Sequence, residues 1–193
     1  MVKSNGFSIL GLDIRINESI NMKVFCYGSN MSSKRLKAED RCPGAKFLCT
    51  AFIEQYVFKF NKKSTLGIGS GKGNIIFTGN SADIVWGIVF EIPEKEEKAL
   101  DDAEGFGKGG YEKEPITVKN NNEDIDVIVY IAINSDYVDD TEKPFDWYKN
   151  HCNKGAIEFD LPTYYAKFLE SFESKKDKNT KRSEEEYSIY LNS

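Results

Sequence analysis

Short runs of β-branched and aromatic residues, without a long helix between each run and the next, limit most strongly what this chain can fold into. Runs typical of strands cover 22–27, 51–60, 84–92 and 125–133. Helical patterns cover 34–39, 94–104 and 162–172. A doubly wound parallel sheet needs strands and long helices in regular alternation, so it is disfavoured. We predict an α+β fold, a small and mostly antiparallel β-barrel flanked by helices.

Length and composition suit a single domain. The 193 residues, 40% of them hydrophobic, can bury one core and leave little room for a second. We place the domain at 22–172, because a compact apolar run starts at Met22. For the leader, 1–21, the alternatives are a disordered segment, a misassigned start, an expression remnant and an extra edge strand. The charged tail, 173–193, is expected to be a solvated helix or a frayed end.

The charge balance favours a small-molecule or protein partner. A net charge of −5 supplies no clustered excess of Lys and Arg, so binding to nucleic acid or to an anionic membrane surface is not expected. No stretch approaches the roughly 18–20 apolar residues that span a bilayer. We therefore expect a cytoplasmic protein. The sequence leaves its oligomeric state open, a homodimer included.

The cysteines and the single histidine do not indicate a metal site or a catalytic triad. Cys26, Cys42, Cys49 and Cys152 form no CxxC pair and have no zinc-ligand spacing, so we expect free buried thiols. His151 is surrounded by no nucleophile-elbow pattern and is expected to be a helix residue without a catalytic role. We expect no metal and no cofactor.

A glycine-containing turn follows the first apolar strand. Tyr27-Gly28-Ser29-Asn30 lies between that strand and the helical pattern near Ser32. Backbone N–H groups at the start of a helix can bind a carboxylate or a developing oxyanion. The alternative is an ordinary glycine turn with a serine cap.

The segment 94–104 is the clearest predicted helix, with Pro93 and acidic residues at its start and Gly105 as its expected C-cap. Within it Leu100, Ala103 and Glu104 have the spacing of one face, from which Asp101 and Asp102 point away.

Burial on that face and the negative end of the helix would both disfavour the ionised form of Glu104. Its pKa should then rise toward neutrality, where a general acid/base works best. The same angular test also brings Glu96 and Glu97 near this face, so helical geometry alone does not select Glu104. A surface glutamate near a helix end is the simpler alternative.

Two glycine-rich segments could form loops beside a site. Gly107–Tyr111 could close over a ligand and let Tyr111 donate a hydrogen bond, or it could be a plain linker. Gly67–Gly73 fits neither the P-loop nor the dinucleotide-binding spacing, and we interpret it as a hairpin or lid that binds no nucleotide.

Together these motifs resemble the γ-glutamylcyclotransferase family, within the AIG2-like superfamily. The similarity runs from about 22 to 169. Each motif alone is weak evidence, and their order along the chain makes the resemblance specific. In chain order they are Tyr27–Asn30, Val85–Ile92, Leu100–Gly105, Gly109–Tyr111 and Gly155–Ala156 followed by Leu161–Pro162.

The resemblance implies a small β-barrel with helices and a metal-free, cofactor-free intramolecular aminolysis. The α-amine of a γ-glutamyl compound would attack its own γ-carbonyl, form 5-oxoproline and release an amine or amino acid. Glu104 matches the family's catalytic glutamate. The residues that match its substrate-binding segments are Phe25, Cys26, Tyr27, Gly28, Ser29 and Asn30 in one loop, with Tyr111 and Tyr148.

Three functions remain open on this basis. The first is cyclotransfer on a free γ-glutamyl amino acid. The second is the same chemistry on a γ-glutamylamine or on a γ-glutamyl group attached to a larger carrier. The third is a non-catalytic γ-glutamyl-binding module, although both Glu104 and the Tyr27–Asn30 motif are retained.

Overall fold

The computed structural model describes residues 21–64, 68–108, 110–121 and 123–191. All of the leader, 1–21, except its last residue lies outside these ranges, as do residues 65–67. The elements are β1 (Met22–Cys26), η1 (Ser29–Met31), α1 (Ser33–Leu36), β2 (Lys46–Glu54), β3 (Tyr56–Lys63), β4 (Gly71–Phe77), β5 (Ile84–Ile92), α2 (Glu94–Glu104), β6 (Glu112–Asn120), β7 (Glu123–Ile131), η2 (Ser135–Tyr137), α3 (Asp146–Glu158), α4 (Thr163–Ser171) and α5 (Thr180–Ser188).

Five strands close into a barrel in the order β1-β5-β2-β6-β7. All neighbouring strands are antiparallel except β1 and β7, which meet in parallel at Val24 and Ile128. Each barrel strand contributes fully buried side chains, among them Ala51, Ile88, Val118 and Val129. Two of the seams close through a single paired position each, Val24 with Ile128 and Phe52 with Lys119. The prediction of a mostly antiparallel barrel flanked by helices is confirmed.

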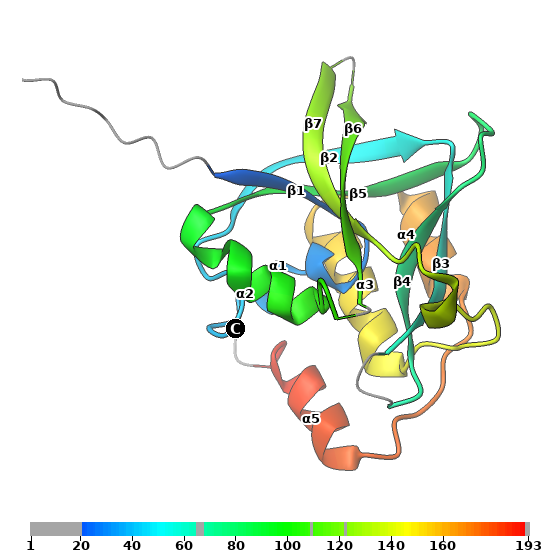
Figure 1. Ribbon diagram of the computed structural model, residues 1–193. Helices are drawn as coiled ribbons and strands as arrows, with labels where there is room; N and C mark the ends of the chain where they lie inside the picture. The colour runs from blue at the N-terminus through cyan, green and yellow to red at the C-terminus, as the bar shows by residue number, and fades with distance from the viewer. Residues whose placement is uncertain (1–20, 65–67, 109, 122, 192–193) are drawn as a thin grey trace, which may run out of the picture.

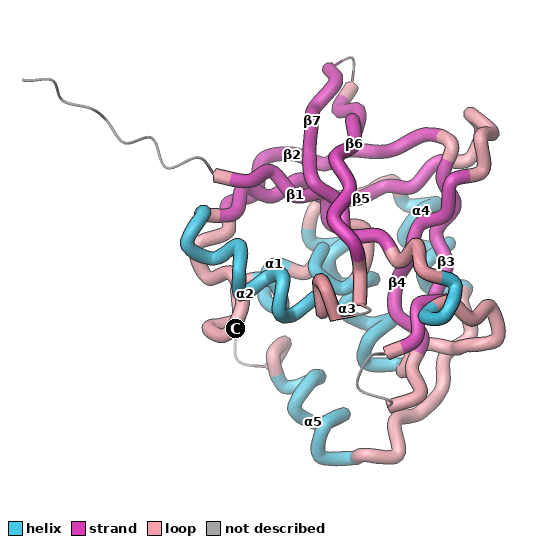
Figure 2. The backbone as a smooth tube through the Cα atoms, in the orientation of Figure 1, coloured by secondary structure: helices cyan, strands magenta, loops and turns pink. Residues whose placement is uncertain are grey.

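The helices gather on one side of this barrel. Figure 1 shows α1, α2 and α3 below the barrel in that view, with α5 beyond them at the bottom. The antiparallel hairpin of β3 and β4 is a separate two-stranded sheet. It extends from the barrel toward the helices, on the right in Figure 2.

The single strand expected over 51–60 is wrong. The backbone of Gln55 has a φ of 68°, and this left-handed residue separates β2 from β3. The turn is held by backbone bonds from Gln55 N to Asp83 O and from Thr78 N to Gln55 O, each 2.7 Å long. A non-glycine residue rarely adopts this conformation, so the apolar run gave no sign of the break.

The expected helix at 94–104 is confirmed with the same bounds. It ends in a Schellman motif, with Phe106 N bonded to Asp101 O at 2.9 Å and Gly105 N bonded to Asp102 O at 3.2 Å. Gly105 has a φ of 68°, a conformation that glycine adopts without steric cost. Glu104 is thus the last residue of α2.

The expected helix at 34–39 is a single turn, and several elements had no prediction at all. The strands β4 and β6 were missed, and α3 was expected only as a helix at His151. Helix α3 buries one side, which includes Trp147, His151 and Ala156, and the apolar Ile157 is exposed on the other side. It therefore lacks the clear apolar stripe by which an amphipathic helix is recognised in a sequence.

The charged tail, 173–193, contains a helix, α5, in which no residue is buried, and a solvated helix was one of the two alternatives expected. Ion pairs attach this helix to the body of the protein. Arg182 binds the carboxylate of Asp177 with two hydrogen bonds, of 2.6 and 2.7 Å, and Asp177 also accepts from Trp147 Nε1 of α3 at 2.9 Å. Charge pairing of this kind does not depend on apolar periodicity, so composition gave no sign of it.

None of the helices in the described ranges is long and apolar enough to cross a membrane.

Replacing Gly155 by alanine is expected to destabilise the protein by about 1–3 kcal/mol, because an added Cβ would lie 2.4 Å from backbone atoms of Met31 and Ser32. Helix propensity alone predicts the opposite sign, a gain of up to about 1 kcal/mol for Gly→Ala inside a helix. Urea unfolding measures the difference, with exposed Ile157→Ala on the same helix as control. A raised unfolding midpoint for Gly155→Ala would contradict the close contact.

Candidate active site

The loop after β1 lies between α3 and β4, with a glycine at each contact. Gly155 of α3 lies directly against the backbone of Met31 and Ser32, where an added Cβ would push the loop away. On the other side, a Cβ added to Gly73 of β4 would lie 3.5 Å from the Gly28 Cα, which is an ordinary van der Waals contact. The small residues that surround the loop therefore hold its backbone in place at 28–32.

One cavity collects every residue proposed for the site from sequence. It lies at the end of β1, between this loop, β4 and the end of α2. The predicted residues that line it are Phe25, Cys26, Tyr27, Gly28, Ser29, Asn30, Glu104, Tyr111 and Tyr148. Val24, Gly73 and Tyr130 line it as well and were not predicted. Gly73 belongs to the glycine-rich segment that we interpreted as a hairpin or lid, and that pattern was the available signal.

The helix dipole contributes less to this loop than the sequence indicated. The loop leads into η1 and then into α1, which spans only Ser33–Leu36. A helix of one turn has a small macrodipole. Ser32 is the N-cap, but its side chain makes no capping bond and instead accepts a hydrogen bond from Tyr190 at 3.0 Å. Any anion bound here would depend on individual N–H groups.

The structure separates the three glutamates that helical geometry left unresolved. The Glu96 carboxylate accepts from Gly44 N at 2.9 Å, and the Glu97 carboxylate pairs with Lys113 at 2.6 Å. Only the Glu104 carboxyl enters the cavity, where it accepts from Asn30 Nδ2 at 2.6 Å.

The predicted inward face of α2 is right for Leu100 and wrong for Ala103 and Asp101. Ala103 is exposed, whereas Asp101 is half-buried against the barrel. There Asp101 accepts a 2.6 Å hydrogen bond from the hydroxyl of Tyr130 and pairs with Lys113. Asp101 therefore lies on the inward side of α2, where it binds Tyr130, and not on the outward side as expected.

The environment of Glu104 contains opposing influences on its charge. Glu104 is half-buried as a residue, but its carboxyl is enclosed by protein, and this burial raises its pKa above the ordinary value. Arg41, the hydrogen bond from Asn30, Arg35 and Lys62 act in the opposite direction. The net change in the pKa is upward. A carboxyl in this state can both accept and return a proton.

Two of the four tyrosine hydroxyls in the cavity donate to backbone carbonyls, and that of Tyr130 donates to Asp101. Tyr111 donates to Gly73 O at 2.5 Å, and Tyr27 donates to Tyr130 O. Tyr148 instead accepts from Gly73 N at 3.1 Å and also has a hydrogen bond with the side chain of Ser29. The expectation that Tyr111 donates to a ligand therefore requires its bond to Gly73 to break.

Burial keeps these groups neutral. It raises the pKa values of Tyr27, Tyr111 and Tyr148 above the ordinary range, and it also raises that of the Cys26 thiol, with Glu104 adding to the effect at Cys26. Cys26 is therefore a thiol at neutral pH and not an activated nucleophile.

A second cleft continues from the first cavity past Glu104. The two share five lining residues, namely Ser29, Asn30, Glu104, Tyr111 and Tyr148. Side chains of Arg35, Arg41, Lys62 and Lys72 line the second cleft, and Arg182 and Glu186 bring α5 to its edge.

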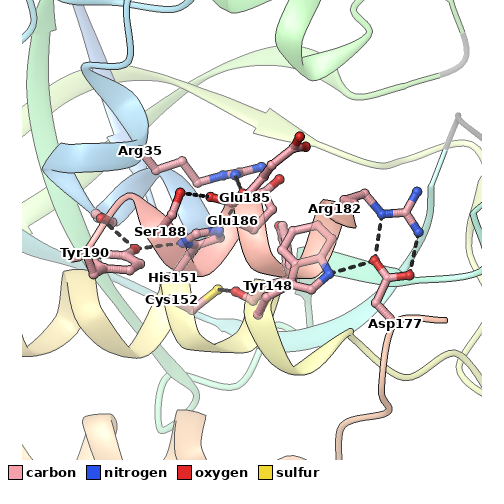
Figure 3. A network of polar contacts seen from close by, with 12 residues as sticks. Arg35, Tyr148, His151, Cys152, Asp177, Arg182, Glu185, Glu186, Ser188 and Tyr190 are labelled. Atoms are coloured by element: carbon pink, nitrogen blue, oxygen red, sulfur yellow. Dashed lines mark hydrogen bonds and ion pairs between the residues drawn. The ribbon is translucent and has the colours of Figure 1, made fainter. Parts of the chain in front are cut away.

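Helix α5 is fixed at this cleft by a network of polar contacts around α3 (Figure 3). Glu186 accepts from Arg35 at 2.6 Å and lies 2.8 Å from His151 Nε2. The other ring nitrogen of His151 lies 2.7 Å from the hydroxyl of Tyr190. Burial lowers the pKa of His151 to about 4, so the ring is neutral at physiological pH. His151 is a buried helix residue that anchors the C-terminal segment.

Among the described residues, no three His, Cys, Asp or Glu side chains come together as a metal site.

Comparisons with known proteins agree with each other. Residues 84–169 match the model of the AIG2-like family. The chain is 30% identical over 163 residues to γ-glutamylcyclotransferase of Bos taurus, which covers 83% of this chain and 84% of the relative. It is 29% identical over 151 residues to the Homo sapiens protein of that name, with 77% of each chain covered. A solved structure titled γ-glutamyl cyclotransferase superposes with a TM-score of 0.77 at 26% identity, over 90% of this chain and 99% of the other.

Replacing Glu104 by glutamine should stabilise the fold at neutral pH more than at acidic pH. Because the folded-state pKa is raised above 4.5, both states bind the proton at low pH and ionisation costs the wild type nothing. As pH rises through the unfolded-state and then the folded-state pKa, a cost develops. It amounts to about 1.4 kcal/mol for every tenfold difference between the acid dissociation constants of the two states. Glutamine does not ionise, so the free energy of unfolding of the variant does not carry this cost.

Urea unfolding of wild type and Glu104→Gln at pH 4 and pH 8 tests this sign, with Glu97→Gln as the control on the same helix. The stability difference between variant and wild type should grow toward pH 8. A difference that shrinks with rising pH would show that the cations around Glu104 outweigh its burial.

Proposed function

The chain belongs to the γ-glutamylcyclotransferase family, and from that premise we propose that it converts a γ-glutamyl amino acid to 5-oxoproline and the free amino acid. The observation that supports this best is the Glu104 carboxyl, enclosed at the end of α2 and hydrogen-bonded to Asn30 at 2.6 Å across a cavity of otherwise neutral groups.

In the proposed reaction the γ-glutamyl group folds back so that its α-amine meets its γ-carbonyl. The α-ammonium loses two protons in becoming the lactam N–H, and the departing nitrogen gains two as it leaves as an ammonium. The new C–N bond forms as the old amide C–N bond breaks. One carboxyl can carry these protons in turn, so Glu104 acts first as base and then as acid.

Proximity and charge stabilisation complete the scheme. The substrate supplies its own nucleophile, so the protein has only to hold the folded-back conformation. We assign that task to the loop Phe25–Asn30 with Tyr111 and Tyr148, whose contacts with Gly73 fix their rings at the wall of the cavity. The N–H groups of Gly28 and Ser29 suit the glutamyl carboxylate or the tetrahedral oxyanion. No step in this scheme requires a metal or a cofactor.

Glu104→Gln is expected to lower the release of 5-oxoproline by about 10²–10⁴-fold, the usual contribution of a general acid/base, because glutamine keeps the shape of the side chain but cannot take a proton. The assay is 5-oxoproline formation from several γ-glutamyl amino acids and γ-glutamylamines. Glu97→Gln, which removes a carboxylate paired with Lys113 outside the cavity, should retain turnover. Undiminished turnover in Glu104→Gln would overturn the mechanism.

A further inference from the structure

Two lysine ammonium groups lie in the second cleft without a carboxylate partner. Lys62 is 2% exposed, and its Nζ lies 5.0 Å from the ring centre of Tyr111. Lys72 has its Nζ between two rings, 4.1 Å from that of Tyr148 and 4.6 Å from that of Trp147. Within the described residues, no Asp or Glu oxygen lies within 4.0 Å of either ammonium. Aromatic faces compensate a buried cation only partly.

Two of the other three cations at the cleft are paired. Arg35 binds Glu186, and Arg182 binds Asp177. The carboxylate of Asp102 is partly exposed and pairs with Lys98 and Lys108 on the outer surface. Because these pairs are neutral or lie outside the cleft, the net charge of the cleft depends on the three remaining cations and on Glu104.

Arg41 and Lys62 interact with the charge of Glu104, whereas Lys72 interacts with that of Glu186, which Arg35 already binds. The cleft thus carries an excess of two positive charges when Glu104 is ionised and Lys72 is protonated. Burial and the charge of Arg35 lower the pKa of Lys72 to about 7, as expected for an ammonium that lacks an anion. An anionic ligand would restore the charge balance.

The place of the lysines defines which part of a substrate they would meet. Tyr111 and Tyr148, over which the two ammonium groups lie, are the side walls shared by the glutamyl cavity and the cleft. The glutamyl group carries one ammonium and one carboxylate, which cancel. The excess charge therefore faces the leaving group.

We propose that Lys62 and Lys72 select a leaving amino acid with two carboxylates, so that the preferred substrates are γ-glutamyl derivatives of acidic amino acids. This inference rests on the proposed function. The α-carboxylate and the side-chain carboxylate of the leaving residue together match the two unpaired ammonium groups. An amine leaving group without a carboxylate would keep both lysines buried and unpaired, which is unfavourable.

The test compares γ-glutamyl-glutamate with γ-glutamyl-glutamine, which have nearly the same shape and differ by one charge. Wild type should show a kcat/KM at least about tenfold higher for the glutamate donor, as expected for one charged hydrogen bond. In Lys72→Met and in Lys62→Met this ratio should fall toward one. Lys63→Met, the neighbour on β3 that does not line the cleft, should keep it.

Calorimetry of both donors with Glu104→Gln measures the preference without turnover. The glutamate donor should bind at least about tenfold more tightly than the glutamine donor, and added salt should reduce the difference. Equal binding, or a preference that survives in both lysine variants, would overturn this inference while leaving cyclotransfer intact. If wild type forms no 5-oxoproline from any donor, the proposed function fails, and the calorimetric ratio still decides whether the lysines prefer the second carboxylate.

Discussion

The direct contact between the backbone of α3 at Gly155 and the loop at Met31 and Ser32 is the constraint on which the site depends. A loop that carries an anion-binding backbone must be rigid, yet η1 and α1 are too short to hold their own conformation. The contact with α3 supplies that rigidity on one side, and Gly73 of β4 supplies it on the other. With the loop fixed, Asn30 meets Glu104, and the end of α2 and the end of β1 become two walls of one cavity.

The electrostatics of the site follow from how this cavity is enclosed. Its own lining consists of neutral tyrosines, a thiol and backbone, so Glu104 loses hydration without gaining a close ion pair. The cations stand one layer further out, in the cleft toward α5. They limit the rise in the pKa of Glu104 without abolishing it. The same arrangement keeps positive charge available where a leaving group would emerge.

Local patterns were sufficient for part of this structure. Pro93, the acidic first turn and Gly105 defined α2 to the residue, because capping and helix dipole effects act within a few residues. The barrel was predictable because its strands are short, β-rich and seldom separated by helices. The order of the motifs associated Glu104 with the Tyr27–Asn30 loop and Tyr111, and the structure groups these residues around one cavity.

Other features depend on contacts between distant residues and had no local signal. The positive φ of Gln55 belongs to this class, and so do the ion pair with Arg35 and the hydrogen bond with His151 that attach α5 to α1 and α3. The choice between Glu96, Glu97 and Glu104 depended on Gly44, Lys113 and Asn30, each on another element. The inward position of Asp101 similarly depended on Tyr130 of β7.

Both ends of α2 are fixed, so the length of this helix sets the position of Glu104. Glu96 ties its first turn to Gly44, and the left-handed Gly105 ends it directly after Glu104. Inserting or deleting one residue between these points would turn the carboxyl by about 100° and shift it by about 1.5 Å. Such a change would turn the carboxyl away from Asn30, and an insertion before Leu100 would also displace that buried side chain. The outer turns of the barrel can therefore vary in length, whereas α2 must keep its eleven residues for Glu104 to reach Asn30.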